Sequence, residues 1–447
     1  MERARRTLPT ALAAVVLAVV ATALAWYRLG PTTRGTVWAE DGGVFLRERL
    51  TYGEAGSLLR PYAGYVQLLP RLVVDLGFRR PIEDYAVTVA GASCLVVGVV
   101  AAAVFVLARD VVPAWPLRVV LAAVPVVLPI APYEISGNAA NLHWYVLLLA
   151  PWLFAHRART WWGSGVVAAI ALGAVLTEPQ TLVFTPLLVL AWWHARGRLL
   201  ALPVTVVTAL AGAAQVTAAL TNTRLSRPGD PTIADVVRGY LLQPLAGAWT
   251  RDLGAVATAV TRHGWIVLVV PLVVVGAVLV GAVVLAPWRT RVLVAALAGG
   301  SVVVWTAALV ANASADQHWG VLPVTAFTAA APLRYSAAAA MLLVSAVVVA
   351  ASVLVDRRCW SVRGRGTARG IAPAVAAVVG WAAIAVVVAA AVGSAAPGAT
   401  QRDDGPLWRP QITGQLDACR ADPSGSVAVT TAPWGATLPC SVLLDRR

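Results

Sequence analysis

The sequence has little charge and none of the short motifs that bind nucleotides or zinc. Charged residues make up 13% of its 447 positions, about half of the ~25% that soluble globular domains carry. No Walker loop, no GxGxxG joining a strand to a helix, no HExxH and no zinc-type cysteine spacing occurs, so nucleotide hydrolysis is not indicated. No internal repeat is apparent, and lysine is absent, to which we assign no function. These shortages exclude an ordinary soluble domain.

Apolar residues are abundant instead, at 59% of the chain. So large a share requires a solvent other than water around much of the surface, which predicts an all-α polytopic membrane protein. Runs suited to about 11 transmembrane helices occur at 8–26, 84–108, 116–132, 141–155, 161–176, 180–194, 199–220, 264–286, 291–312, 335–355 and 371–394. The run at 141–155 is short and follows a polar break, so its start is the least defined.

The first apolar run has two interpretations. Three arginines precede it, and Ala23-Leu24-Ala25 resembles the small residues of a signal-peptide cleavage site. Its apolar core is longer than that of a usual signal peptide, which favours a retained membrane anchor over a cleaved signal.

Residues 30–83 are too polar to span a membrane and form the first outer loop. Within them, Val44–Leu59 and Tyr65–Phe78 mix apolar and charged residues at helical spacing. We expect two helices that lie in the membrane interface, joined by a Pro-Tyr-Ala-Gly turn. A second long outer loop is expected at 221–263.

The arginines favour a cytoplasmic N-terminus. The inner segments 1–7, 109–118, 156–160, 194–198, 287–291 and 356–370 then hold 16 arginines, whereas the short outer loops 133–140, 177–180 and 313–334 hold only Arg334. This bias follows the positive-inside rule, and an odd number of spans puts the C-terminus outside. The net charge of +14 is scattered over these loops, so no nucleic-acid partner is expected.

Residues 397–447 are expected to form a small extracytoplasmic tail after a transmembrane module at 1–396. The tail holds Cys419 and Cys440. In an oxidising compartment these two would pair and close a loop of about 20 residues, worth roughly 3 kcal/mol in chain entropy. Cys94 falls in a span and Cys359 in an inner loop, so neither is placed to compete. Two free thiols are the alternative.

Polar side chains gather at the expected outer ends of the spans. They are Glu40, Asp41, Arg71, Glu134, Asn138, Asn141, His143, Glu178, Asp316, His318 and Arg334. An ionisable group near membrane depth is costly unless paired or hydrated, so each is a candidate functional residue. Glu178 is the sharpest case, in a very short loop between apolar runs, although a turn residue is the alternative. His143 beside Trp144 is either a site residue or part of an interfacial packing pair.

A carboxylate at the membrane boundary beside arginines suits one kind of reaction. The carboxylate can accept the proton of an attacking hydroxyl, an effect of about 10²–10⁴ in rate. An arginine can bind a phosphate through two parallel hydrogen bonds and stabilise it as it leaves. We therefore expect a sugar to move from a polyprenyl-phosphate donor to an acceptor hydroxyl outside the cytoplasm.

The layout resembles the polytopic GT-C glycosyltransferases of bacterial envelopes. The matching features are the acidic pair Glu40-Asp41 soon after the first span, the first outer loop with its two helices, the many short inner loops, and Arg334-Tyr335 at the start of a late span. The stretches PYAGYVQLLPRL and GNAANLHWYVLLLAPWLF also resemble actinobacterial members. The likeness covers most of the chain in layout but only short stretches in motif.

The resemblance implies an envelope glycan or lipid acceptor, a site on the outer face of a bacterial plasma membrane, and roles for individual residues. Asp41 would be the general base or a ligand of a divalent cation, with Glu40 as its neighbour or substitute. Arg334 would bind the lipid phosphate, and Tyr335 and Arg71 are grouped with it. The residues assigned to supporting roles at the substrate are Glu178, His143, Asn141, Glu134 and His318. For a Mg²⁺ or Mn²⁺ ion the candidate ligands are Asp41, Asp316 and His318, although nothing in their spacing requires one.

Two other functions stay open from the sequence. One is a transporter or flippase of a lipid-linked saccharide, which needs access from both membrane faces, whereas the polar groups cluster on one. The other is an envelope polysaccharide ligase or a non-catalytic subunit. A ligase would depend on Arg334 and His318 of a late outer loop and not on Asp41.

Overall fold

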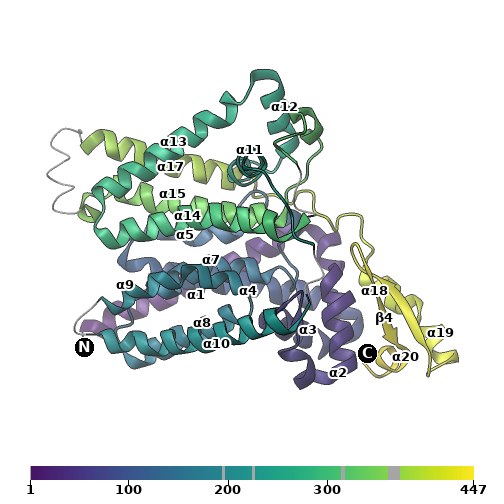
Figure 1. Cartoon of the computed structure of the whole chain (residues 1–447). Coiled ribbons are helices and arrows are strands. Elements are labelled where there is room, and N and C mark those ends of the chain that lie inside the picture. Colours follow the sequence, from purple (N-terminus) through teal and green to yellow (C-terminus); the bar gives the residue numbers. More distant parts are fainter. Residues whose placement is uncertain (1, 194–196, 224–226, 314–317, 361–372, 447) are drawn as a thin grey trace.

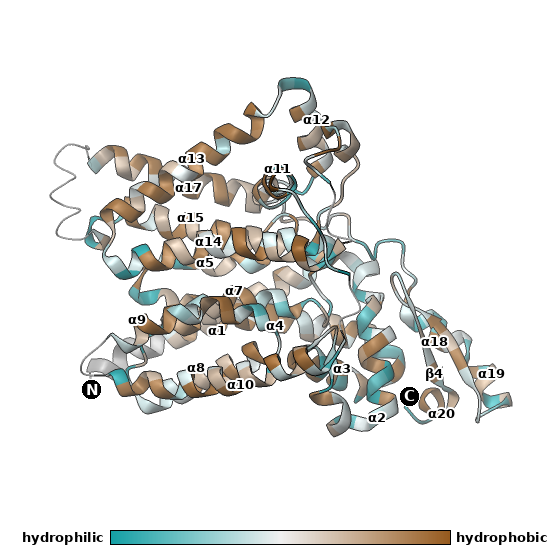
Figure 2. Ribbon diagram, in the orientation of Figure 1, coloured by the Kyte–Doolittle hydropathy of each residue, from teal (hydrophilic) through white to brown (hydrophobic). Residues whose placement is uncertain are grey.

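The structure is a computed structural model that describes residues 2–193, 197–223, 227–313, 318–360 and 373–446. It is a bundle of helices that run roughly side by side (Figure 1). The N-terminus lies at one end of the bundle and the C-terminal residues lie at the other, and we call these the N-terminal end and the C-terminal end. Figure 2 shows hydrophobic residues along the bundle helices and many of the hydrophilic ones near the two ends.

Seven of the described helices are long and apolar enough to cross a membrane. They are Thr10–Gly35, Ile82–Asp110, Arg198–Thr221, Ile266–Leu285, Trp288–Ala311, Arg334–Val355 and Pro373–Gly393. Each coincides with a transmembrane helix expected from the sequence. The prediction of an all-α membrane protein is therefore confirmed.

The other four expected spans are shorter apolar helices at Trp115–Val127, Leu142–Ala155, Trp161–Val175 and Pro179–Trp192. At 1.5 Å per residue such helices reach about 20 Å, less than the ~30 Å hydrocarbon core of a bilayer. Prolines lie inside three of them, at Pro125, Pro151 and Pro186. The segment 128–141, whose one regular element is the four-residue helix α6 (Ala131–Glu134), and the loop 176–178 continue the chain at the C-terminal end of the bundle. Both carry part of the site described below.

The centre of the bundle is α15 (Arg334–Val355), of which the most apolar stretch is 94% buried. It packs against α14 (Trp288–Ala311), α17 (Pro373–Gly393) and α13 (Ile266–Leu285). Alanine, serine and valine make up most of its length, and small residues let neighbouring membrane helices approach closely.

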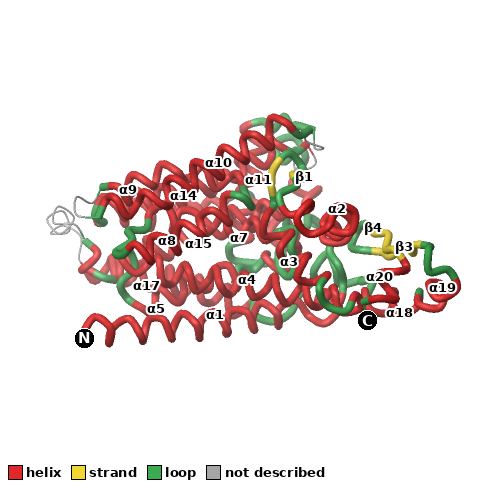
Figure 3. The backbone as a smooth tube through the Cα atoms, turned by 90° about the horizontal axis from the view of Figure 1, so that it is seen from below, coloured by secondary structure: helices red, strands yellow, loops and turns green. Residues whose placement is uncertain are grey.

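A second close contact joins α1 (Glu2–Gly35) and α4 (Tyr85–Leu107). A Cβ added to Gly98 of α4 would lie 2.2 Å from the hydroxyl oxygen of Thr22 in α1. A larger residue would therefore push the two helices apart. Figure 3 shows α1 along one edge of the bundle, with α2 and the C-terminal elements gathered at the far end.

The segment 30–83, which we expect to be the first outer loop and continue to call by that name, contains the two expected helices. A π-helical turn, η1 (Asp41–Leu46), continues into α2 (Arg47–Leu58), and α3 (Leu68–Phe78) follows. Between them β1 (Pro61–Tyr62) and β2 (Tyr65–Val66) pair as an antiparallel hairpin, whose turn residues Ala63 and Gly64 have φ of 53° and 88°. Because Tyr65 and Val66 belong to this hairpin, the second helix begins at Leu68, later than expected.

The tail packs against the first outer loop. It consists of α18 (Trp408–Gly414), α19 (Leu416–Ala421), the antiparallel pair β3 (Ser426–Thr430) and β4 (Gly435–Pro439), and α20 (Cys440–Asp445). The predicted disulfide between Cys419 and Cys440 is present. Backbone hydrogen bonds of 2.9 Å join Ala432 to Val37 and Ala39, and the indole of Trp408 donates to the Ile82 carbonyl at 2.7 Å.

The remaining elements complete the chain. They are η2 (Ile82–Asp84), η3 (Ala108–Asp110), α5 (Trp115–Val127), α6 (Ala131–Glu134), α7 (Leu142–Ala155), α8 (Trp161–Val175), η4 (Pro179–Leu187), α9 (Leu188–Trp192), η5 (Arg198–Ala201), α10 (Leu202–Thr221), α11 (Ile233–Tyr240), η6 (Leu241–Leu245), α12 (Leu253–His263), η8 (Val324–Phe327) and η9 (Arg357–Cys359). The expected loop 221–263 thus contains short helices, and α11 and α12 lie at the C-terminal end of the bundle (Figure 1).

Candidate functional site

A cavity of about 350 Å³, which we call the polar cavity, lies at the C-terminal end of the bundle. Its walls come from the starts of α7, α15 and η4, the end of α14 and the β1–β2 hairpin. A second cavity of about 290 Å³, the tail-side cavity, shares with it the wall residues Glu40, Arg334, Tyr335 and Trp434. A cavity of about 410 Å³ near α12 is larger, but Arg251 and Asp252 are its only charged lining residues. Ionisable groups converge instead on the polar cavity.

Arg334 lies in the shared wall and is held by two carboxylates. Its Nη1 lies 3.6 Å from an oxygen of Glu40 and 3.6 Å from an oxygen of Glu134. Its backbone N–H, one of the unpaired donors at the start of α15, donates to the other Glu134 oxygen at 3.1 Å. Burial raises the pKa of Glu134, and the charge of Arg334 opposes that shift. Because the ion pairs are longer than hydrogen bonds, guanidinium N–H groups remain for an anionic ligand.

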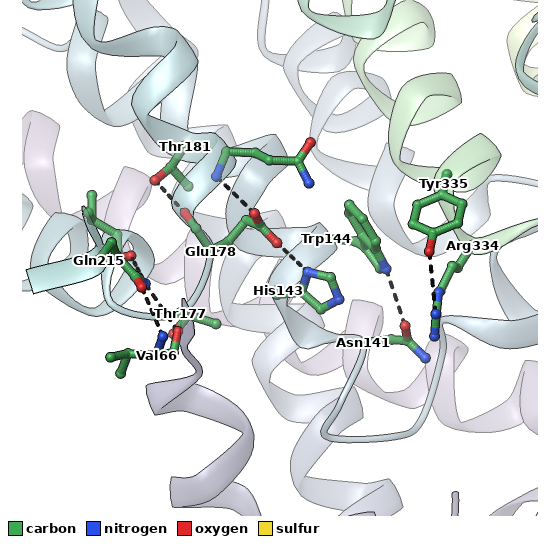
Figure 4. Close-up of polar contacts among 12 residues, drawn as sticks. Val66, Asn141, His143, Trp144, Thr177, Glu178, Thr181, Gln215, Arg334 and Tyr335 are labelled. Carbon is green, nitrogen blue, oxygen red and sulfur yellow. Dashed lines mark hydrogen bonds and ion pairs between the residues drawn. The ribbon is translucent and has the colours of Figure 1, made fainter. Parts of the chain in front are cut away.

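His143 and Glu178 form a buried pair in the wall of the polar cavity (Figure 4). One Glu178 oxygen contacts Nδ1 of His143, and the other accepts the Gln180 N–H at 2.8 Å. The side chains of His143 and Glu178 are only 9% and 2% exposed. A carboxylate on one ring nitrogen fixes the tautomer and the orientation of an imidazole, so Nε2 is the nitrogen left to exchange a proton.

Aromatic rings line much of the remaining wall. The Trp144 ring contacts that of His143 at a tilt of 41°, with centroids 4.0 Å apart, and meets the Tyr335 ring edge-on at 5.6 Å. Tyr62 and Tyr65 come from the hairpin. Burial raises the pKa of Tyr62 to about 12 and that of Tyr65 well above its usual value, so both hydroxyls stay protonated. The cavity therefore combines flat apolar surfaces with a few hydrogen-bonding groups, as small-molecule sites do.

The segment between α6 and α7 is fixed by its own asparagines. Asn138 donates to the Glu134 carbonyl at 2.7 Å, and its side-chain oxygen accepts the Asn141 N–H at 2.9 Å. The Asn141 side chain donates to the same Glu134 carbonyl at 3.3 Å and accepts from the Trp144 indole at 3.2 Å. Asn141 lines the polar cavity, whereas Asn138 does not line it and only holds Asn141 in place.

Asp41, predicted as the base, faces this segment instead of either cavity. Its two carboxylate oxygens accept the N–H groups of Ala139 and Ala140 at 2.9 and 2.8 Å, and it is 1% exposed. Burial raises the pKa of Asp41 to about 7, against the lowering effect of these two hydrogen bonds and of Arg402. Asp41 therefore positions the start of α7, which carries His143.

Arg402 of the tail supports the same segment from the other side. Its guanidinium donates to the carbonyls of Ser136, Gly137 and Thr36 at 2.6, 3.0 and 3.2 Å. Gly137 has a φ of 68°, and a Cβ there would lie 2.2 Å from the Leu29 side chain. The turn thus requires glycine, and a buried cation holds it.

The other predicted residues are not brought to the cavities. Arg71 is 3% exposed, lies 2.7 Å from Glu48 in an ion pair, and stands over the Phe45 ring. His318 lies beside α11, where it helps to lower the pKa of Asp235. Asp316 lies outside the described residues. Among the residues that are described, no three His, Cys, Asp or Glu side chains form a group that could hold a metal ion.

Trp434 is a site residue that the sequence did not single out, as are Tyr62 and Tyr65. It stands in the turn between β3 and β4, more than 90 positions from Arg334 in sequence, yet it lines both cavities. In the sequence, Trp434 is marked only by its position in a turn-forming stretch of the tail, Ala-Pro-Trp-Gly. No pattern in the sequence shows that this turn packs on the segment following α1.

Comparisons with known proteins add no relative. No protein-family model matches the sequence, no curated protein matches it, and no solved structure matches the fold.

Proposed function

We propose that the chain is a membrane-embedded glycosyltransferase that moves a sugar from a polyprenyl-phosphate donor to a hydroxyl of an envelope acceptor. The observation that carries the proposal is the pair of adjoining cavities that share Arg334, with a His–Glu pair in the wall of one. A transferase needs two substrates side by side. A shared cation supports the assignment of a phosphate to the boundary between them.

Arg334 is the proposed phosphate ligand. Glu40 and Glu134 hold its guanidinium at 3.6 Å each, and Nη2 donates to the Tyr335 hydroxyl at 3.4 Å. The other N–H groups can donate to phosphate oxygens. As the bond between the sugar and the phosphate breaks, negative charge grows on the phosphate. A fixed guanidinium stabilises that charge without having to reorganise.

His143 is the proposed general base, and this assignment differs from the one that the sequence favoured. Asp41 has both oxygens occupied by backbone N–H groups, and it lines neither cavity. His143 lines the polar cavity and is oriented by Glu178. Histidine is the commonest general base because its ordinary pKa lies near neutral pH.

The reaction then balances within the site. The acceptor oxygen forms a bond to the anomeric carbon of the sugar while its proton passes to Nε2 of His143. The bond between that carbon and the phosphate oxygen breaks, and the polyprenyl phosphate leaves on Arg334. Attack from the side opposite the phosphate inverts the anomeric carbon. The aromatic rings of Trp144 and Tyr335 supply flat surfaces for the sugar.

The proposed membrane arrangement has about eleven spans, a cytoplasmic N-terminus and an outer C-terminal end. Seven are the long helices, and the four short apolar helices would cross together with the segments that continue them. The arginine bias supports it, as does the Cys419–Cys440 disulfide, because such bonds persist in oxidising compartments. The site would then lie on the outer face of a bacterial plasma membrane. The ligase alternative depends on His318, which lines neither cavity, and this counts against it.

The test is transfer in reconstituted vesicles from a panel of polyprenyl-phosphate sugars, with radiolabelled sugar and a lipid or glycan acceptor. The proposal expects a new glycoside from at least one donor. Movement of labelled donor across the vesicle membrane without a new glycoside would instead identify a transporter of the lipid-linked saccharide.

A further inference from the structure

A third cavity, of about 160 Å³, lies at the N-terminal end of the bundle, far from the site above. It lies between the end of α7, the start of α14, α9 and the turn after α4. Its charged lining residues are Asp110, Arg157 and Arg289, and Trp152 and Trp288 supply its aromatic surface. We call it the basic cavity.

Two arginines of the basic cavity converge on a single acceptor. Nε of Arg157 and Nη2 of Arg289 donate to the same backbone carbonyl, that of Leu190, at 3.2 and 3.0 Å. Neither guanidinium has an ion pair with a carboxylate of a described residue. Asp110, the acid in the wall, lies 2.7 Å from Arg159, which does not line the cavity. Two like charges thus share one neutral oxygen, which leaves the cavity with an excess of positive charge.

Hydrogen-bond donors are in excess there as well. The indole nitrogen of Trp152, a residue only 2% exposed, and Nε of Arg289 are buried without an acceptor. Arg289 also lies in the first turn of α14, whose start at Pro287 has no side-chain cap. The first N–H groups of a helix favour an anion. Buried donors normally find partners, so these unpaired groups indicate a missing acceptor.

We propose that the basic cavity binds the phosphate of an anionic membrane lipid. An anion supplies the acceptor oxygens that Arg157, Arg289 and Trp152 lack. A lipid is favoured over free phosphate because Trp193 and Trp288 pack edge-on nearby, with ring centroids 5.5 Å apart, and are 70% and 42% exposed. Exposed tryptophans mark the level of lipid headgroups, and basic pockets between membrane helices hold anionic ones. The inference is independent of the proposed function.

The experiment uses the full chain purified in a neutral detergent. Thermal unfolding is followed while phosphatidylglycerol, phosphatidylcholine or inorganic phosphate is titrated, and native mass spectrometry counts the bound lipid. Phosphatidylglycerol is expected to bind at one site and to raise the melting temperature with concentration. Phosphatidylcholine is expected to do neither. Inorganic phosphate alone giving the full shift, with no bound lipid, would overturn the lipid assignment.

Variants distinguish binding in the basic cavity from a general effect of positive charge. Arg289→Gln is expected to weaken phosphatidylglycerol binding on the order of tenfold or more, the usual effect of losing a charged hydrogen bond, and Arg157→Gln serves as a second variant if the first does not fold. The matched control is Arg291→Gln on the same helix turn, which removes the same charge but does not line the cavity. Equal weakening by Arg291→Gln, or none by either cavity variant, would overturn the proposal.

Discussion

Nη1 of Arg334 lies 3.6 Å from an oxygen of Glu40, although the two residues are 294 positions apart in the sequence. Glu40 follows the first bundle helix, and Arg334 begins the central one. This ion pair keeps the guanidinium in the wall shared by the two cavities. Because 3.6 Å is longer than a hydrogen bond, it leaves N–H donors of the guanidinium available. The proposed phosphate ligand is thus oriented before a donor arrives, which lowers the cost of binding.

Replacing Arg334 by Gln is expected to weaken use of the polyprenyl-phosphate donor. Loss of one charged hydrogen-bonding group costs about 1.5–3 kcal/mol, or roughly 10–150-fold in kcat/KM. The measurement is initial rate against donor concentration in vesicles. Arg262→Gln is the control, because Arg262 is exposed at the same end of the bundle and lines neither cavity. Equal losses in both variants would contradict the assignment.

Replacing Trp434 by Ala is expected to raise KM for a substrate by roughly 5–50-fold while leaving kcat nearly unchanged. Truncation removes apolar wall area from both cavities but no group that reacts. Full kinetic curves for donor and acceptor would show which substrate is affected. Trp162→Ala, a change at an 82% exposed tryptophan, is the control. A fall in kcat with unchanged KM values would give Trp434 a different role.

The helices and the disulfide are the features of the fold that the sequence predicted. The apolar runs predicted the positions of all seven long helices and of the four short ones, because membrane burial selects composition. Helical spacing predicted the two loop helices, and the position of two cysteines in the tail, away from the other two, predicted their bond. These features are local, or depend on a few residues of a single type.

The site depends on contacts that no local pattern encodes. The sequence singled out the acidic pair, but the structure places its two members differently: Glu40 lines both cavities, whereas Asp41 accepts backbone N–H groups. A π-helical turn begins at Asp41, and the sequence does not predict it. The contact of Trp434 with the site arises from packing of the tail, which sequence periodicity cannot show. Arg402 was likewise unforeseen as a ligand of backbone carbonyls.

Asp41 predicts a pH dependence of stability. Its pKa is about 7 when buried and about 3.9 in an unfolded chain. Between these values the folded state holds a proton that the unfolded state has released, so the stabilising contribution is full below pH 4 and is lost as the pH rises through 7. Asp41→Asn cannot titrate. The melting temperature of wild type minus that of the variant should therefore fall as the pH rises from 5 to 8. A value of this difference that rises with pH would refute the assignment.

Removing the disulfide should loosen the tail. The double change Cys419→Ser and Cys440→Ser opens a loop with a sequence separation of 21, worth about 3 kcal/mol in the chain-entropy model. The tail should then be cut faster by a protease added outside the vesicles, and transfer should fall because Trp434 loses its support. Cys359→Ser, at a free and half-buried thiol, is the control. Equal protease lifetimes for wild type and the double variant would contradict the expectation.

The central claim is that His143 takes the acceptor proton beside a phosphate held by Arg334. Its most direct test compares single-turnover sugar transfer from polyprenyl-phosphate donors by wild type, His143→Gln and His263→Gln, the last a change at an exposed histidine at the same end of the bundle. The account predicts that His143→Gln still binds donor but transfers about 10²–10⁴ times more slowly, while His263→Gln matches wild type. Unchanged transfer by His143→Gln would contradict it.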